Sequence, residues 1–360
     1  MSEQRVAIVH PWLVHVRGGE KVFIELARAF PDADLYLLFA NLDRCPPDIR
    51  GRVRTTKLQQ TPLKDLSYRA TLPLLPAAIE SIDLSSYSLV ISSSSGWAHG
   101  ALAAEGATHL CYMHTPPRYL WGERAPGRAA RAVGSVLNPV MTMLRTWDVA
   151  AANRVSTFLA NSSLTAQRIS DRYGRTSTVL HPPTDVEPYL ALPRDPQGYA
   201  LYVGELVEYK RVDLAIDAAR RLNIPLLIVG DGPERAALER RAAGADVHFF
   251  GRASDQLKQA LITGASVFLY GGVEDFGITF VEMLAAGVPV VGIEQGGLAE
   301  IGEHGGVSFA EDQSAEAFAE AAAACLDNPS KFVARDSARR FSTQEFVSKF
   351  RTIAEGLVPA

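Results

Sequence analysis

Two glutamates, Glu274 and Glu282, have seven residues between them and can bind a ligand that carries hydroxyl groups at both ends. The apolar run 265–270 predicts a buried strand before them, and the small-residue segment 283–287 predicts a helix that closes on glycine. Carboxylates accept hydrogen bonds from hydroxyls. A sugar nucleotide offers sugar hydroxyls at one end and ribose hydroxyls at the other. The alternative is that both glutamates are solvated on a helix surface.

The stretch between the glutamates predicts an anion site. Phe276, Gly277 and Ile278 fall where the predicted loop enters the helix. The first N–H groups of a helix have no partner within it, and the helix dipole adds positive potential there. We therefore expect these three N–H groups to bind a phosphate group.

Three cationic side chains follow predicted strands of the second half of the chain. Lys210 and Arg211 come after the run 200–203 and begin a helix, and Arg252 comes after the run 247–249. Ligands of parallel sheets bind at the carboxyl ends of the strands. We expect Lys210 and Arg211 to neutralise a diphosphate leaving group and Arg252 to contact phosphate.

Two features of the first half also indicate a ligand. His114 ends the apolar run 108–113 at a double proline, where it would point into a cleft between domains and bond a sugar hydroxyl or orient an acceptor. A structural histidine is the alternative. Gly18 and Gly19 precede a predicted helix and would let the backbone approach a ligand closely, although a simple tight turn explains them as well. They form no G-x-G-x-x-G or P-loop pattern, so we expect no nicotinamide or flavin cofactor.

Short apolar runs alternate with helix-like stretches along the whole chain. The predicted strands are 6–9, 34–39, 89–92, 108–113, 157–160, 200–203, 225–229, 247–249, 267–270, 289–292 and 307–309. This alternation predicts parallel sheets covered by helices on both faces. The serines at 92–95 are interpreted as a loop after a strand.

The chain is long enough for two domains. The proline-rich segment 181–196 predicts a linker between them. We expect an α/β protein with two Rossmann-like, doubly wound domains, residues 1–185 and 186–340, that face a cleft. We also expect an amphipathic helix within 341–360, which packs back on the first domain.

The charge is unevenly distributed, although the net charge is only -4. Residues 1–185 carry 20 basic and 15 acidic side chains, and the remainder carries 16 and 25. One basic cluster is Arg50, Arg52, Arg54 and Lys57, and another is Arg118, Arg124, Arg128 and Arg131. A basic half favours an anionic partner such as phosphate or lipid head groups. No nucleic-acid-binding motif is present, so we expect no nucleic-acid partner.

Several classes of protein are disfavoured by the sequence. No apolar run is long enough to cross a membrane, and the chain begins without a signal-peptide pattern, so we expect a cytoplasmic protein. The three cysteines form neither a disulfide framework nor a zinc pattern. Asp32 and Asp34 match a short D-x-D pattern but lie between a helix and the start of a strand. We interpret them as a cap and a loop, and we expect no metal.

With these segments in order, the chain resembles glycosyltransferase family four over nearly its whole length. The segments that carry the resemblance are 18–22, 114–119, 161–162, 209–213, 230–234, 250–252 and 274–277, and the two glutamates match the E-x7-E motif of retaining enzymes. The segments 114–119 and 209–213 are similar to bacterial mannosyltransferases that build surface polysaccharides on a polyprenyl diphosphate carrier.

The resemblance implies a GT-B fold, with an acceptor domain followed by a nucleotide-sugar domain, and transfer with retention of configuration. It implies GDP-mannose as donor, no metal, and a lipid-linked oligosaccharide acceptor at the inner face of the cytoplasmic membrane. The roles it implies, residue by residue, are donor-sugar contact for Glu274 and His114, ribose contact for Glu282, diphosphate contact for Gly277, Ile278 and Lys210, and a place near the phosphates and acceptor for Gly18 and Gly19.

One position departs from the family pattern. Glu205 stands where family members usually carry an arginine that pairs with Lys210 on the diphosphate. Either Arg211 or Arg252 substitutes for it, or Glu205 turns away, or the activity is altered. The rival hypotheses are another GT-B enzyme that uses a UDP-sugar or a sugar-phosphate acceptor, and a non-catalytic nucleotide-sugar-binding protein. An NAD-linked dehydrogenase is disfavoured because its fingerprint is absent.

Overall fold

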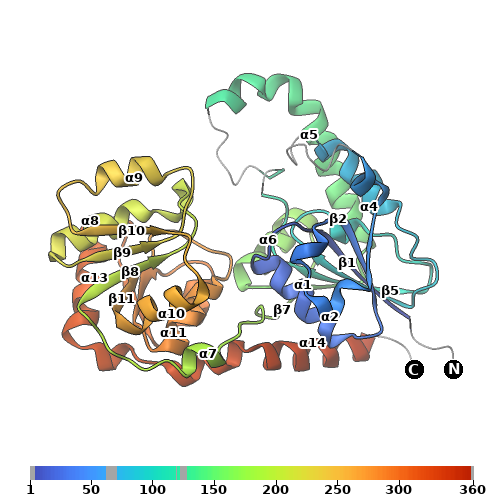
Figure 1. Cartoon of the computed structure of the whole chain (residues 1–360). Coiled ribbons are helices and arrows are strands. Elements are labelled where there is room, and N and C mark those ends of the chain that lie inside the picture. Colours follow the sequence, from blue (N-terminus) through green and yellow to red (C-terminus); the bar gives the residue numbers. More distant parts are fainter. Residues whose placement is uncertain (1–4, 62–70, 119, 122–127, 358–360) are drawn as a thin grey trace. The chain divides into compact units, whose positions relative to one another are not determined.

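The computed structural model describes residues 5–61, 71–118, 120–121 and 128–357, without the side chains of 128–138. The chain divides into two compact units, Met1–Pro183 with Phe346–Ala360, and Thr184–Glu345. The sequence had placed these divisions at residues 185 and 340. Each unit is built around one parallel sheet (Figure 1).

The first unit holds a seven-stranded parallel sheet in the order β3-β2-β1-β4-β5-β6-β7. Its strands are β1 (Val6–Leu13), β2 (Asp34–Ala40), β3 (Val53–Thr55), β4 (Leu89–Ser94), β5 (Thr108–Met113), β6 (Thr157–Ala160) and β7 (Thr178–Val179). All five strands predicted for this half are confirmed. The two that the sequence did not predict, β3 and β7, are too short to show an apolar run.

Strand β4 corrects one interpretation. Ser92, Ser93 and Ser94 belong to the strand and are fully buried, although the sequence indicated a loop there. Their hydroxyls remain satisfied because each bonds to a histidine ring nitrogen. Serine is therefore compatible with this central strand, since histidines on neighbouring elements supply the polar partners.

Helices flank the first sheet and connect its strands. They are α1 (Gly18–Ala29), α2 (Pro47–Arg50), α4 (Leu75–Glu80), α5 (Arg128–Arg154) and α6 (Ser163–Tyr173), with 3-10 turns η1 (Leu42–Arg44), η2 (Lys57–Gln60), η4 (Leu72–Leu74) and η5 (Ala98–Gly100). The last helix, α14 (Thr343–Leu357), also packs here, as the sequence predicted. Phe350 of α14 lies edge-on to Phe30, and Arg351 donates to the carbonyl of Ala29.

The second unit holds a six-stranded parallel sheet in the order β10-β9-β8-β11-β12-β13. Its strands are β8 (Tyr199–Val203), β9 (Leu226–Val229), β10 (Val247–Gly251), β11 (Ala265–Leu269), β12 (Val290–Ile293) and β13 (Val307–Ala310). Its helices are α7 (Glu187–Leu190), α8 (Val212–Leu222), α9 (Arg235–Arg241), α10 (Asp255–Gly264), α11 (Ile278–Ala286), α12 (Gly297–Gly302) and α13 (Ala315–Asp327), with 3-10 turns η6 (Glu208–Lys210), η7 (Pro329–Phe332) and η8 (Arg335–Phe341). Every strand predicted for this half is confirmed.

The order of the second sheet locates its ligand edge. The strand order reverses between β8 and β11, which are hydrogen-bonded neighbours although β9 and β10 separate them in sequence. Doubly wound sheets bind ligands at the carboxyl ends of the two strands that flank such a reversal. The loops that follow β8 and β11 therefore meet, and these loops carry Lys210 and Glu274.

Candidate functional site

The loop after β11 leads into a helix N-terminus, as the sequence predicts. Helix α11 begins at Ile278 and ends at Ala286, and the left-handed backbone of Gly287 closes it. Gly277 caps the start with φ 92°, and a Cβ there would lie 2.3 Å from the ring of Phe280. Only glycine fits this position. The first N–H groups of a helix have no partner within it, so a helix that begins directly after this tight turn suits an anion.

Glu274 lies beside Lys210 at this edge. The Nζ atom of Lys210 is 3.0 Å from Oε1 of Glu274, and both side chains are about one-fifth exposed. The hydroxyl of Tyr270 donates to the same Oε1. The structure thus brings together two residues predicted for the site and adds a third, Tyr270, that the sequence analysis did not select.

Two pairs of glycines let the backbone close around this loop. A Cβ on Gly271 would lie 2.6 Å from the carbonyl oxygen of Arg211, and a Cβ on Gly272 would lie 2.7 Å from Cα of Lys210. From the other side, Cβ atoms on Gly296 and Gly297 would each lie 2.2 Å from backbone atoms of the 274–276 segment. These close approaches fix Lys210 beside Glu274.

Glu282 is buried in α11 and holds a cation. Its Oε2 lies 2.5 Å from Nζ of Lys258 in α10, and the same Nζ donates to the hydroxyl of Tyr189 at 3.0 Å. Burial alone would lower the pKa of Lys258, but the charge and hydrogen bond of Glu282 outweigh it and raise that pKa. Burial and the charge of Glu282 also raise the pKa of Tyr189 to about 12. Glu282 is therefore a fixed, buried carboxylate, and not a solvated one.

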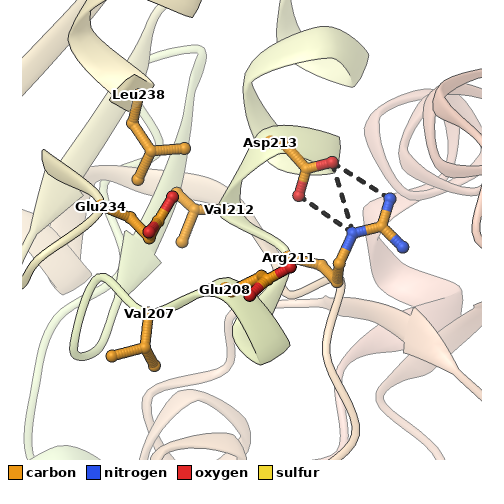
Figure 2. Close-up of a pocket in the computed structure, with 7 residues that line it drawn as sticks. All are labelled: Val207, Glu208, Arg211, Val212, Asp213, Glu234 and Leu238. Atoms are coloured by element: carbon orange, nitrogen blue, oxygen red, sulfur yellow. Dashed lines mark hydrogen bonds and ion pairs between the residues drawn. The ribbon is translucent and has the colours of Figure 1, made fainter. Parts of the chain in front are cut away.

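Arg211 pairs with Asp213. Its Nε and Nη2 donate to Asp213, at distances of 3.0 to 3.3 Å. Figure 2 shows this pairing. The two side chains line a pocket of about 390 Å³, together with Glu208 and Glu234. Three carboxylates against one guanidinium make this pocket unsuitable for an anion. The expectation that Arg211 contacts a diphosphate thus finds no support in this conformation.

Arg252 and Glu205 lie at the same carboxyl edge. Arg252 follows β10 directly and is exposed, and in the described part of the chain it makes no ion pair. Glu205 follows β8 and is also exposed, and its carbonyl accepts from the hydroxyl of Tyr202 at 3.3 Å. Of the two arginines expected to replace the family's missing cation, Arg252 is the one without an acidic partner.

In the first unit, His114 belongs to a bridge of three polar side chains. Its Nε2 lies 2.9 Å from Oγ of Ser93, and the same Oγ lies 3.1 Å from Nδ1 of His10. Nδ1 of His10 also lies 2.9 Å from the carbonyl oxygen of Ser93, so that nitrogen carries the proton. Burial, and then the proximity of His114, lower the pKa of His10 to about 3, so its ring is neutral.

Gly18 and Gly19 begin α1 next to this bridge. A Cβ on Gly19 would lie 3.6 Å from Nε2 of His114, an ordinary contact distance. The side chain of Glu20 accepts from the backbone N–H of Arg17 at 3.0 Å and caps the helix. Protein packing therefore does not require glycine at 19, because an alanine would make only ordinary contacts with His114 and His10.

The arginines of the first basic cluster serve the fold. Arg50 donates to the carbonyl of Cys45, Arg54 pairs with Asp34 at 2.7 Å, and Arg52 donates to three backbone carbonyls between residues 27 and 33. These contacts use three of the four cations expected to attract an anionic partner. In the second cluster, Arg124 and the side chains of Arg128 and Arg131 lie outside the described residues.

Asp34 of the D-x-D pattern is likewise structural. Besides Arg54, it accepts from the hydroxyl of Tyr87 at 2.5 Å. In the part of the chain that the structure describes, no group of three or more His, Cys, Asp or Glu side chains could hold a metal ion. No helix among the described residues is long and apolar enough to span a membrane.

The residues that sequence analysis missed are Tyr270, Lys258, Ser93 and His10. For three of them the sequence carries a weak signal. Tyr270 ends an apolar run with a polar hydroxyl, His10 interrupts another apolar run, and Ser93 stands in a row of serines. Lys258 had no local signal at all, because its partner Glu282 lies on a different helix.

Comparison with known proteins now identifies the family. A model described as Glycosyltransferase Family 4 matches residues 16–188, and one described as Glycosyl transferases group 1 matches residues 191–344. The GDP-mannose-dependent alpha-(1-6)-phosphatidylinositol dimannoside mannosyltransferase of Mycobacterium tuberculosis is 30% identical over 302 residues, 76% of this chain and 74% of that protein. The chain belongs to glycosyltransferase family four.

Other known proteins share shorter stretches of sequence or the fold. D-rhamnosyltransferase WbpZ of Pseudomonas aeruginosa is 34% identical over 114 residues, 30% of each chain. The structure of Anabaena HepE in complex with UDP superposes with a TM-score of 0.72 and 17% identity, covering 98% of this chain and 100% of that one. Sucrose-phosphate synthase from Thermosynechococcus elongatus gives a TM-score of 0.73, also at 17% identity, covering 99% of both chains. The predicted GT-B fold with two Rossmann-like domains is confirmed.

Proposed function

We propose that this glycosyltransferase transfers mannose from GDP-mannose to a lipid-linked acceptor, with retention of configuration. The observation that carries the proposal is the placement of Lys210 3.0 Å from Glu274, at the entrance to α11. A cation, a carboxylate and a helix N-terminus suit the diphosphate and the sugar of one nucleotide-sugar donor. The choice of GDP-mannose is supported by the name of the M. tuberculosis relative.

In the proposed reaction the acceptor hydroxyl attacks the face of the sugar from which the diphosphate departs. Lys210 and the N–H groups of Gly277 and Ile278 stabilise the charge that develops on the leaving diphosphate. Glu274 accepts hydrogen bonds from sugar hydroxyls and Glu282 from ribose hydroxyls. His114 contacts the donor sugar. Positioning and electrostatics supply the rate, and neither a protein nucleophile nor a metal is assigned a part.

The acceptor is proposed to be an oligosaccharide on polyprenyl diphosphate. A lipid acceptor is supported by the relative, whose name specifies phosphatidylinositol dimannoside. Such an acceptor would bring the protein to the inner face of the cytoplasmic membrane. Flotation with anionic liposomes at low salt tests this part, and protein that stays wholly in the soluble fraction would remove it. Transfer assays with both lipid classes would separate the two acceptors.

The donor is tested by thermal shift without metal. We expect GDP and GDP-mannose to raise the melting temperature, and UDP, UDP-glucose, UDP-GlcNAc and NAD to leave it unchanged. A rise in melting temperature with UDP compounds alone would refute GDP-mannose as the donor but would not affect the family assignment. Glu274→Gln should then abolish transfer with the melting temperature preserved, and transfer at the wild-type rate would refute the site assignment.

A second candidate is a nucleotide-sugar-binding protein without turnover. Glu205 motivates it, because a carboxylate at the diphosphate edge repels the leaving group. Donor binding without transfer, followed by transfer in Glu205→Arg, would favour this candidate. Transfer by the wild-type protein excludes it.

A further inference from the structure

Tyr270 holds an unusually restrained position at the end of β11. Its side chain is almost fully buried, with 2% exposure. The ring stacks on Tyr202 with centroids 5.7 Å apart and meets Phe280 edge-on at 4.9 Å. These contacts fix the direction of the phenol hydroxyl, which donates to Oε1 of Glu274.

The carboxylate of Glu274 is held through only one of its oxygens. Both Tyr270 and Lys210 bond to Oε1. Among the residues that the structure describes, no hydrogen bond or ion pair reaches Oε2. A carboxylate oxygen that is partly exposed and has no protein partner is available to accept from a ligand hydroxyl.

Lys210 and Tyr270, which both donate to Oε1 of Glu274, should respond differently to a bound diphosphate. Lys210 carries a charge on a flexible stem, and a diphosphate would compete with Glu274 for it. The phenol of Tyr270 is neutral and rigidly packed, so a phosphate cannot draw it away. Burial, followed by the nearby charge of Glu274, raises the pKa of Tyr270, which keeps the hydroxyl protonated and able to donate.

We propose that Tyr270 is a positioning residue that holds Oε1 of Glu274 while Lys210 turns to the leaving diphosphate, so that Oε2 can accept a hydrogen bond from a hydroxyl of the donor sugar. The inference rests on the proposed function, because it assigns Glu274 to the sugar. Tyr270 acts through Glu274 and does not itself touch the donor.

The test compares Tyr270→Phe with Tyr202→Phe. Both variants remove one hydroxyl from the same aromatic stack, but the hydroxyl of Tyr202 bonds to the carbonyl of Glu205 and not to Glu274. A hydrogen bond to a charged group corresponds to roughly a tenfold to hundredfold effect. We expect Tyr270→Phe to lower kcat/KM for the nucleotide sugar by about that factor, with inhibition by the free nucleoside diphosphate within about threefold of wild type.

Tyr202→Phe should stay within about threefold of wild type in both measurements. A purely structural effect of Tyr270→Phe would change the melting temperature and the nucleoside diphosphate affinity together, and would contradict the inference. In a Glu274→Ala background, Tyr270→Phe should change nucleotide-sugar affinity by less than about twofold, because the acceptor of the Tyr270 hydroxyl is already removed.

Two further outcomes distinguish the role of Tyr270 from the proposed function. A wild-type protein that transfers sugar, combined with a Tyr270→Phe variant that behaves like Tyr202→Phe, would overturn the role of Tyr270 alone. A wild-type protein that neither binds nor turns over any nucleotide sugar would overturn the proposed function, and this inference with it.

Discussion

Gly272 lies so close to Lys210 that a Cβ on the glycine would be 2.7 Å from Cα of the lysine. It would also be 2.6 Å from the carbonyl oxygen of Tyr209. Both neighbours are backbone atoms, which cannot rotate away as a side-chain tip can. The loop after β11 and the turn η6 therefore pack backbone to backbone, and this contact sets Lys210 within reach of Glu274.

Gly272→Ala should displace η6 and separate Lys210 from Glu274. Overpacking of this kind costs about 1–3 kcal/mol of unfolding free energy, and we expect kcat/KM to fall by more than about tenfold because the lysine moves. Urea denaturation and steady-state kinetics measure the two effects. Gly51→Ala is the control, since a Cβ there meets nothing within 4 Å. Unchanged kinetics in Gly272→Ala would show that transfer does not depend on the position of η6.

Gly19→Ala should separate activity from stability. A Cβ at this position would make only ordinary contacts, at 3.6 Å from His114 and 3.8 Å from His10. We expect the melting temperature to change by less than about 2 °C, because no protein atom must move. If a ligand fills the space beside His114, transfer should fall by roughly tenfold or more. Full activity in Gly19→Ala would show that no ligand contacts this glycine and that it is a simple turn residue.

The positions of the strands could be predicted because buried parallel strands are continuous apolar runs, as in β5 and β6. The helix start at Ile278 could be predicted because Gly277 follows an acidic loop. The contact between Lys210 and Glu274 could not be predicted in this way, because it depends on β8 and β11 being neighbours in the sheet. Local sequence does not encode that order.

The basic cluster shows a second limit of sequence analysis. Arginines at 50, 52 and 54 look alike in sequence, but in the structure they bond to carbonyls or to Asp34. An arginine used as a cap has the same local pattern as one that attracts lipid. Only tertiary structure separates the two roles, because the acceptors come from distant segments of the chain.

The stability of the first unit should fall as the pH drops below about 6.5. Burial lowers the pKa of both His10 and His109 to about 3. Between pH 6.5 and 3 the unfolded chain binds protons at these histidines while the folded chain does not, so acid favours unfolding. The stability that depends on these two histidines being neutral is fully present above pH 6.5. It is lost progressively as the pH falls toward 3. At pH 5.5 each histidine lowers the unfolding free energy by about 1.4 kcal/mol relative to its value at high pH.

Tryptophan fluorescence in urea measures this effect selectively, because all four tryptophans lie in the first unit. The loss of unfolding free energy between pH 7 and pH 5.5 should be about 1.3 kcal/mol smaller in His109→Gln than in wild type. The comparison is between two pH values of one variant, so any general destabilisation cancels. His15→Gln, at an exposed position, should behave like wild type. An equal loss in all three proteins would show that His109 does not contribute.

The pair Lys258–Glu282 should separate folding from nucleotide recognition. Lys258→Met leaves the buried carboxylate of Glu282 without a cation, which costs about 3–5 kcal/mol of unfolding free energy. The double variant Lys258→Met with Glu282→Gln has no unpaired charge and should regain most of that stability. If Glu282 binds the ribose, as proposed, the double variant should nevertheless bind the nucleotide poorly.

Comparison of GDP with 2′,3′-dideoxy-GDP isolates the ribose contact in that experiment. If Glu282 accepts from the ribose hydroxyls, wild type should prefer GDP by roughly tenfold or more, as expected for hydrogen bonds to a charged group. The double variant should bind the two nucleotides within about threefold of each other. A stable double variant that keeps the full preference for GDP would show that Glu282 and Lys258 form a structural ion pair, and that the ribose is bound elsewhere.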